Sequence, residues 1–295
     1  MIDLFYAYRP LFDFILINCG LALSQYIVLR AGVFSLASAG FAAIGAYTAA
    51  ILTMRAGVGL WLGLFIALLA GGLAGAILAV PLARLRGIFQ AIATLAFVQI
   101  VMSLNLYAEP ITGGAAGLTA IPRLAETWHI FAFLACLIYV FISINRNGMG
   151  RVFDTLRQDE AVAVSLAISV TRYQTLCFIM SGAIAGVMGA FMAYRNYAIT
   201  PDDFGFPMLV GILVFVVLGG RSTIIGPLVG AVIMTILPEL ARPLAEYRTL
   251  IQGAVLILVM IYFQEGLVDT AIFKLRNILR KRKPAPQPKE VRHVA

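Results

Sequence analysis

The sequence predicts an all-α, polytopic integral membrane protein. Of its 295 residues, 61% are hydrophobic and only 12% are charged, which is about half the charged share of a soluble globular domain. The apolar residues form successive runs near the roughly 20 residues that a helix needs to cross a bilayer. A soluble fold cannot bury this much apolar surface, whereas a membrane accepts it directly.

The apolar runs divide the chain into about nine transmembrane helices. We assign residues 1–267 to this transmembrane domain and residues 268–295 to a basic cytoplasmic tail that is expected to be disordered at its end. The first run lacks the basic start and small-residue cleavage site of a signal peptide, so it counts as a span. The predicted spans are 12–29, 33–54, 59–83, 88–107, 127–144, 173–194, 206–219, 224–241 and 248–264.

The distribution of positive charge sets the expected orientation. With the N-terminus outside and the C-terminus in the cytoplasm, 16 of the 22 Lys and Arg residues fall on the cytoplasmic side, as the positive-inside rule requires. Eight of them belong to the tail, where a basic stretch over 274–283 suits contact with anionic lipid. The net charge of +8 therefore needs no nucleic-acid partner.

Ionisable residues are nearly absent from the predicted spans. Asp13, Glu239 and Arg242 lie at span edges, and no acidic residue lies in the middle of a span. Because ionisable residues inside a membrane usually mark proton relays, ion sites or catalysis, this pattern argues against a proton-coupled transporter and a membrane-embedded enzyme. No His/Asp/Glu cluster points to a metal. We therefore predict no catalytic and no metal-binding residues.

Uncharged polar residues do occur within the spans, and two roles are open for them. Ser24, Gln90, Thr94 and Gln99 are examples. Such side chains either satisfy one another between helices or line a path for a polar solute. The sequence leaves both roles open.

Pairs of glycines indicate how the helices pack. Gly182 and Gly186, like Gly226 and Gly230, have the four-residue spacing that lets two helix backbones approach closely. We predict these four glycines as helix-packing positions.

One charged stretch, 145–172, interrupts the apolar runs. It is too long to be only a turn between helices, and the predicted orientation places it in the cytoplasm. On composition alone it could be an ordinary solvated amphipathic loop. A docking site for a partner is the other interpretation.

Five segments resemble the permease subunits of branched-chain amino-acid ABC transporters, the Liv-type family, and its M-type subunit more than its H-type partner. Together they cover most of the chain, in the family's order and spacing. They are SLASAGFAAIGAYTAA (35–50), PLARLRGIFQAIATLAF (81–97), TGGAAGLTAIP (112–122), residues 152–191 and GGRSTIIGPLVGAVIMTILPEL (219–240).

The resemblance implies that residues 151–167 form a coupling helix that docks on an ATP-hydrolysing subunit. Val152, Phe153 and Leu156 would give an apolar docking edge. Arg157, Asp159 and Glu160 would make charged contacts at its rim. Residues 161–167, from Ala161 to Ala167, would lead back to the membrane.

One position within this predicted helix departs from the family. Ala167 stands where family members usually carry glycine, and alanine can continue a helix that glycine would end. The resemblance also gives candidates for the translocation path, which are Ser38, Tyr47, Gln90 and Thr94.

The implied assembly is an importer in the bacterial inner membrane. Its other parts would be an H-type-like second permease subunit, two ATPase subunits that hold ATP and Mg, and a periplasmic or lipid-anchored solute-binding protein. This chain would bind no cofactor, and its solute would be leucine, isoleucine or valine. Urea, short amides or other amino acids are the alternative solutes, and a secondary transporter is the alternative mechanism.

Overall fold

A computed structural model describes residues 2–240, 253 and 266–270 of the chain. Helices account for nearly all of the regular structure in these residues, and a single β-bridge joins Leu118 to Ile199. The elements are α1 (Ile2–Arg30), α2 (Ser38–Ala56), α3 (Leu60–Leu82), α4 (Ile88–Tyr107), α5 (Glu109–Thr112), η1 (Gly114–Ala116), α6 (Thr127–Arg146), α7 (Gly148–Gln158), α8 (Glu160–Ser165), α9 (Val170–Asn196), η2 (Pro201–Phe204), α10 (Phe206–Gly219) and α11 (Ile225–Leu240).

Seven of the predicted spans coincide with helices long and apolar enough to cross a membrane. They are Arg9–Arg30 of α1, the whole of α2, α3, α4, α6 and α9, and Pro201–Gly219, which includes α10. The eighth predicted span, 224–241, corresponds to α11, an apolar helix of 16 residues. The ninth, 248–264, and most of the tail predicted at 268–295 lie outside the described residues. The chain is thus an all-helical, multi-pass membrane protein.

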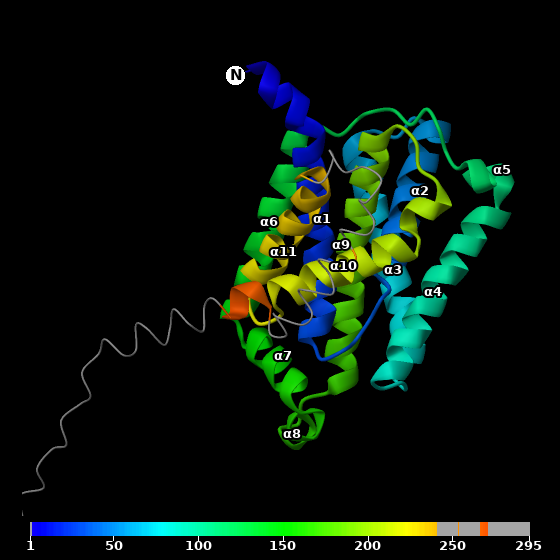
Figure 1. Cartoon of the computed structure of the whole chain (residues 1–295). Helices are drawn as coiled ribbons and strands as arrows, with labels where there is room; N and C mark the ends of the chain where they lie inside the picture. The colour runs from blue at the N-terminus through cyan, green and yellow to red at the C-terminus, as the bar shows by residue number, and fades with distance from the viewer. Residues whose placement is uncertain (1, 241–252, 254–265, 271–295) are drawn as a thin grey trace, which may run out of the picture.

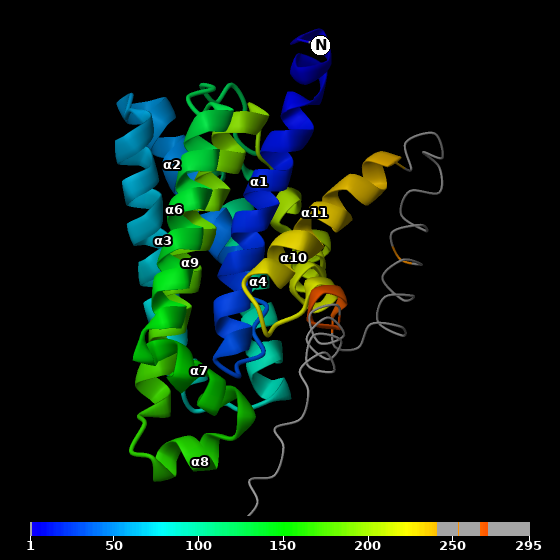
Figure 2. The same ribbon diagram turned by 90° about the vertical axis from the view of Figure 1, so that its left-hand side faces the viewer.

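Helix α9 lies at the centre of the bundle (Figures 1 and 2). It packs most extensively against α3 and α2, and then against α1. Within its most apolar window 78% of the residues are buried, against 28% for α4 and 22% for α6. Helices α4 and α6 therefore form the outside of the bundle. Helices α7 and α8 lie together at one end of the molecule, which we call the α7–α8 end, and α5 lies at the opposite end (Figure 1).

Glycines bring the central helices into backbone contact. A Cβ on Gly182 would overlap the carbonyl oxygen of Gly71 on α3, and one on Gly186 would lie 2.6 Å from that of Ala67. On α11, a Cβ on Gly230 would overlap the carbonyl oxygen of Phe215 on α10. Gly226 is similarly close to the backbone at the end of α10. Larger residues at these four positions would force the helices apart.

A buried ion pair ties α1 to the end of α9 that lies far from α7 and α8. Asp13 is 2% exposed, and its carboxylate pairs with the guanidinium of Arg195. Asp13 lies one turn inside the apolar part of α1, as its predicted place at a span edge suggested. A charge at this depth is costly unless it is paired, so the contact explains why both residues are tolerated there.

Candidate functional site

The predicted coupling helix is two helices in the structure. Helix α7 (Gly148–Gln158) ends where Asp159 becomes extended, with φ −159° and ψ 119°. The Asp159 carboxylate then accepts a hydrogen bond from the Ala161 amide at 2.7 Å, and so caps the start of α8 (Glu160–Ser165). The single helix expected over 151–167 is therefore wrong. Asp159 is a helix cap, because its short carboxylate competes with the backbone hydrogen bond that would continue α7.

Helix α8 ends in a Schellman motif centred on Ala167. The Ile168 amide donates to the Ala163 carbonyl and the Ala167 amide to the Val164 carbonyl, each at 3.0 Å. Ala167 has φ +60°, the left-handed conformation that glycine adopts most readily. The sequence left the effect of alanine here open, and in the structure α8 ends at this residue, because these two hydrogen bonds hold the turn despite the Cβ.

The apolar side of α7 faces the body of the protein. Phe153 is 1% exposed and Leu156 is 2% exposed. The Phe153 ring meets Tyr173 of α9 edge-on, with centroids 6.2 Å apart. An exposed docking edge made of Phe153 and Leu156 is therefore ruled out in this conformation. These two residues fix α7 to the chain's own helices, and whether they take part in coupling stays a prediction.

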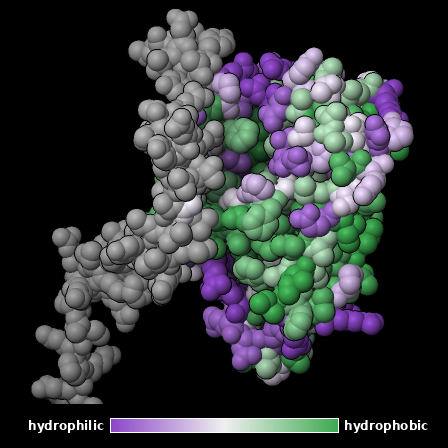
Figure 3. Space-filling view, turned by 45° about the vertical axis from the view of Figure 1, so that its right-hand side comes forward, coloured by the Kyte–Doolittle hydropathy of each residue, from purple (hydrophilic) through white to green (hydrophobic). Residues whose placement is uncertain are grey.

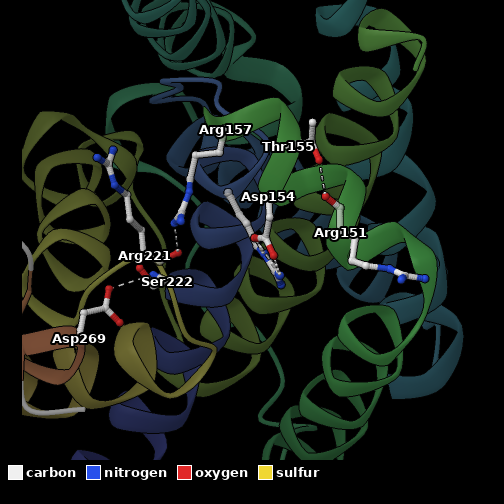
Figure 4. Close-up of polar contacts among 8 residues, drawn as sticks. Arg151, Asp154, Thr155, Arg157, Arg221, Ser222 and Asp269 are labelled. Carbon is white, nitrogen blue, oxygen red and sulfur yellow. Dashed lines mark hydrogen bonds and ion pairs between the residues drawn. The ribbon is translucent and has the colours of Figure 1, made fainter. Parts of the chain in front are cut away.

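A buried arginine fixes α7 to the end of α1. The Arg30 side chain is 6% exposed and pairs with Asp154 at 3.2 Å, with further contacts to the carboxylate at 3.4 Å (Figure 4). Its guanidinium also lies 5.9 Å from the centroid of the Tyr26 ring. A guanidinium with a carboxylate on one side and an aromatic ring on another is held in a fixed place. Sequence reasoning missed this contact, although the basic last turn of α1 was visible.

The far end of α7 reaches the loop between α10 and α11. Arg157 donates to the carbonyl oxygen of Arg221 at 3.3 Å, and the neighbouring Ser222 amide donates to Asp269 at 2.9 Å. In Figure 4, Arg157 points toward this loop, whereas Arg151, which is exposed, points away from it. Helix α7 therefore bridges α1 and the α10–α11 loop.

Glu160 links two other elements rather than standing free. Its carboxylate lies 3.5 Å from the Arg86 guanidinium, in the segment between α3 and α4. It also accepts a hydrogen bond from Gln174 of α9 at 3.2 Å. The charged residues predicted for the rim thus contact this chain itself. Arg157 contacts the α10–α11 loop, Asp159 caps the start of α8, and Glu160 contacts Arg86 and Gln174.

Large apolar side chains on and just after α8 are exposed. Val162 is 48%, Val164 61% and Leu166 62% exposed, while Ala163 between them is fully buried. We call Val162, Val164 and Leu166 the α8 tip. It lies at the extremity of the α7–α8 end (Figure 2). Exposed apolar side chains grouped in this way mark contact surfaces. The alternation of apolar and small residues after Asp159 was the sequence signal for them.

The four predicted path residues are buried inside the bundle. Ser38 belongs to a network in which it donates to Gln25 at 2.6 Å, and Ser24 lies 3.1 Å from Ser181. Ser24 therefore hydrogen-bonds to a polar residue of another helix, which is the first of the two roles that the sequence left open. Ser38 shares this environment, and its predicted role in transport stays a prediction.

The other three path residues are also enclosed by the chain. Thr94 accepts from the Leu36 amide at 3.0 Å, and Gln90 donates to the Leu82 carbonyl at 3.4 Å. The Tyr47 hydroxyl is buried with no partner among the described residues. Thr94 also donates to the Gln90 carbonyl at 2.9 Å, so these two residues lie beside Leu36, close to Ser38, whereas Tyr47 lies further along α2 against Phe204. Within the described residues, no group of three His, Cys, Asp or Glu side chains could hold a metal ion.

Comparison with known proteins gives one consistent result. The family model described as branched-chain amino acid transport system / permease component matches residues 14–260. The high-affinity branched-chain amino acid transport system permease protein LivM of Escherichia coli (strain K12) is 35% identical over 299 residues, which is 89% of this chain and 70% of LivM. LivM of Salmonella typhimurium is 35% identical over 288 residues, 86% of this chain and 68% of LivM. LivH of Escherichia coli (strain K12) is 30% identical over 139 residues, 46% of this chain and 44% of LivH. No solved structure matches the chain.

Proposed function

Because this chain belongs to the family of branched-chain amino acid transport system permease components, we propose that it is the M-type permease subunit of an ABC importer for leucine, isoleucine and valine. A second, H-type permease subunit completes the path through the bacterial inner membrane. Two ATPase subunits bind ATP and Mg, and a solute-binding protein delivers the amino acid. The chain itself transports and carries out no chemistry.

The observation that carries this proposal is that α7 is fixed to the rest of the chain, whereas the apolar side chains of the α8 tip are exposed. The α8 tip presents Val162, Val164 and Leu166 to solvent at the extremity of the molecule, and a groove on an ATPase subunit would remove them from water. Burial of such side chains is favourable by about 25 cal/mol per Å² of apolar surface. The α8 tip is therefore the contact that we assign to the ATPase.

Helix α7 would pass the motion of the ATPase to the membrane helices. It is fixed to α1 by the Arg30–Asp154 pair and to the α10–α11 loop by Arg157. A displacement of α8 then moves both elements together. ATP binding and hydrolysis would favour one of two arrangements of the spans, which gives alternating access to the solute.

The test uses the complete transporter in proteoliposomes. The double variant Val164→Ser/Leu166→Ser should lose most of the solute-stimulated ATP hydrolysis and leucine uptake, because it removes apolar surface from the ATPase contact without disturbing a buried residue. Ile111→Ser is the matched control, since Ile111 is apolar, 49% exposed and in α5 at the opposite end. Full stimulation in the double variant would overturn the assignment of the α8 tip.

The solute is tested separately by competition. Uptake of labelled leucine should be inhibited by isoleucine and valine and not by urea or acetamide. Uptake of amides in place of amino acids would overturn the assignment of the solute. It would not affect the assignment of the α8 tip as the ATPase contact.

A further inference from the structure

The exposed side of α4 carries polar and small residues among large apolar ones such as Ile100 and Leu104, which are 58% and 64% exposed. Ile92, Ala96, Gln99, Ser103 and Tyr107 follow one another at helical spacing and are all exposed. We call these five residues the α4 stripe. The opposite face of the helix, which includes Ala91, Thr94, Val98 and Val101, is buried, and α4 packs chiefly against α2. The stripe thus points away from the rest of the described chain.

Two polar side chains belong to this stripe, one of them at the middle of the span. Gln99 is close to the centre of the 20-residue helix and Ser103 is one turn further on. Within the described part of the chain, neither side chain has a hydrogen-bonding partner. Lipid tails can supply none, and an amide side chain carries two donors and an acceptor. Polar residues at this depth face protein or water rather than lipid.

Helix α3 shows what an apolar, lipid-facing surface in this protein looks like. Its exposed residues include Trp61, Phe65, Leu69, Leu73 and Ile77, and no polar residue occurs anywhere in Leu60–Leu82. The face that comes forward in Figure 3, on the side of α4, instead shows hydrophilic side chains among the hydrophobic ones at mid-height. The exposed surfaces of α3 and α4 therefore differ in polarity.

The small residues in the stripe indicate a helix as the occupant. Ala96 and Ser103 flank Gln99 by about one turn on either side, and small residues there allow a neighbouring helix backbone to come close. An amide on such a seam can then hydrogen-bond to a polar group of the facing helix. A path for water or solute would need no small residues on either side of the amide.

We propose that the α4 stripe is the surface on which the second permease subunit packs, with Gln99 hydrogen-bonded to a polar group of the facing transmembrane helix. The identity of this partner rests on the function proposed above. The complementarity is specific: the occupant must be a membrane-spanning helix that offers a hydrogen-bonding group at mid-depth. Neither lipid nor a soluble subunit meets that requirement.

The test is photo-crosslinking in the assembled transporter in native membranes. A benzophenone amino acid replaces Gln99, Ser103 or, as the control, Leu73, which is 62% exposed on α3. Positions 99 and 103 should crosslink to the second permease subunit and position 73 to lipid alone, with mass spectrometry identifying each product. The proposal would be overturned if position 99 crosslinked instead to lipid, to residues 241–265 of this chain or to a second copy of this chain.

Transport and assembly measurements separate this proposal from the proposed function. Gln99→Leu should leave the chain inserted but reduce the second permease subunit that co-purifies with it by about fivefold, as expected for one hydrogen bond between transmembrane helices. Gln99→Asn should retain more of the partner than Gln99→Leu. If the complete importer assembles and transports leucine while Gln99→Leu retains its partner in full, the α4 stripe is not the interface with the second permease subunit. The proposed transport function would be unaffected by that result. If no importer assembles, both proposals fall.

Discussion

Helices α7 and α8 belong to the same charged stretch of the chain. The large apolar side chains of α7 are buried against the protein, whereas those on and just after α8 are exposed. Helix α7 buries Phe153 and Leu156 and pairs Asp154 with a buried arginine. The α8 tip leaves Val164 and Leu166 more than half exposed. The same stretch therefore contains a helix that buries its large apolar side chains and a helix that exposes them. We propose that anchoring and partner contact are separate tasks of these two helices.

The difference has a local cause in the chain. Helix α7 has three turns, enough to place Phe153 and Leu156 on one face at a spacing of three residues. Helix α8 has only six residues between the Asp159 cap and the Schellman turn at Ala167. So short a helix is marginal by itself. It buries Ala163 and leaves its larger apolar side chains exposed.

The largest expected effect is on stability and separates the two helices directly. Phe153→Ala should lower the free energy of unfolding by about 3–5 kcal/mol, because it removes a fully buried ring that packs on Tyr173. Leu166→Ala, at a 62% exposed position, should change it by less than about 0.5 kcal/mol. Denaturant unfolding of the purified chain in detergent compares the two. Equal losses would contradict the distinction between the buried apolar side of α7 and the exposed α8 tip.

The next effect concerns the Arg30–Asp154 pair. Asp154→Ala leaves the buried Arg30 guanidinium without its carboxylate and should cost about 2 kcal/mol, less than the 3–5 kcal/mol of a fully buried pair because Asp154 is 46% exposed. It should also lower the leucine carried per ATP hydrolysed.

A double variant separates the interaction between Arg30 and Asp154 from the other effects of each substitution on stability. Adding Arg30→Gln to Asp154→Ala removes the unpaired buried charge, so part of the lost stability should return. Additive losses in the double variant would show that the two residues do not interact energetically.

A smaller effect is expected at the break between the helices. Asp159→Ala removes the acceptor for the Ala161 amide and should weaken α8 by about 1 kcal/mol. Asp159→Asn keeps an acceptor and is the matched control. Hydrogen exchange at the amides of residues 161–166 measures the change. Faster exchange that spreads through α7 as well would mean that the two helices form one unit.

The sequence was sufficient to locate seven of the nine predicted spans, but not to show what covers the apolar side of α7. Hydropathy alone located seven helices, because length and apolar content are local properties of the chain. The apolar side of α7 was equally visible in Phe153 and Leu156, yet the identity of the surface that covers it depends on Tyr173 and Gly32, which are distant in sequence. An amphipathic helix shows that it has a partner without showing which one.

The buried polar residues show the same limit. Ser24 and Ser181 are 157 residues apart and become hydrogen-bonding partners only when α1 and α9 pack. No spacing rule connects them, so structural and path-lining roles could not be separated beforehand. The turn at Ala167 was uncertain for a different reason. Its conformation follows from two backbone hydrogen bonds, which residue preference predicts only on average.

The smallest expected effect is that of Ala167→Gly, at the residue where α8 ends. A non-glycine residue in the left-handed conformation costs about 1–2 kcal/mol, and glycine relieves this cost while adding about 0.4–1 kcal/mol of entropy to the unfolded chain. Ala167→Gly should therefore stabilise α8 by about 0–1 kcal/mol. Ala167→Val should destabilise it by about 1–3 kcal/mol, because a branched Cβ is disfavoured at φ +60°. Exchange of the Ala167 and Ile168 amides, which form the Schellman hydrogen bonds, measures both changes. Since Ala167 is exposed, neither variant alters a buried contact, and a valine variant with unchanged exchange would show that this turn does not hold the α8 tip in place.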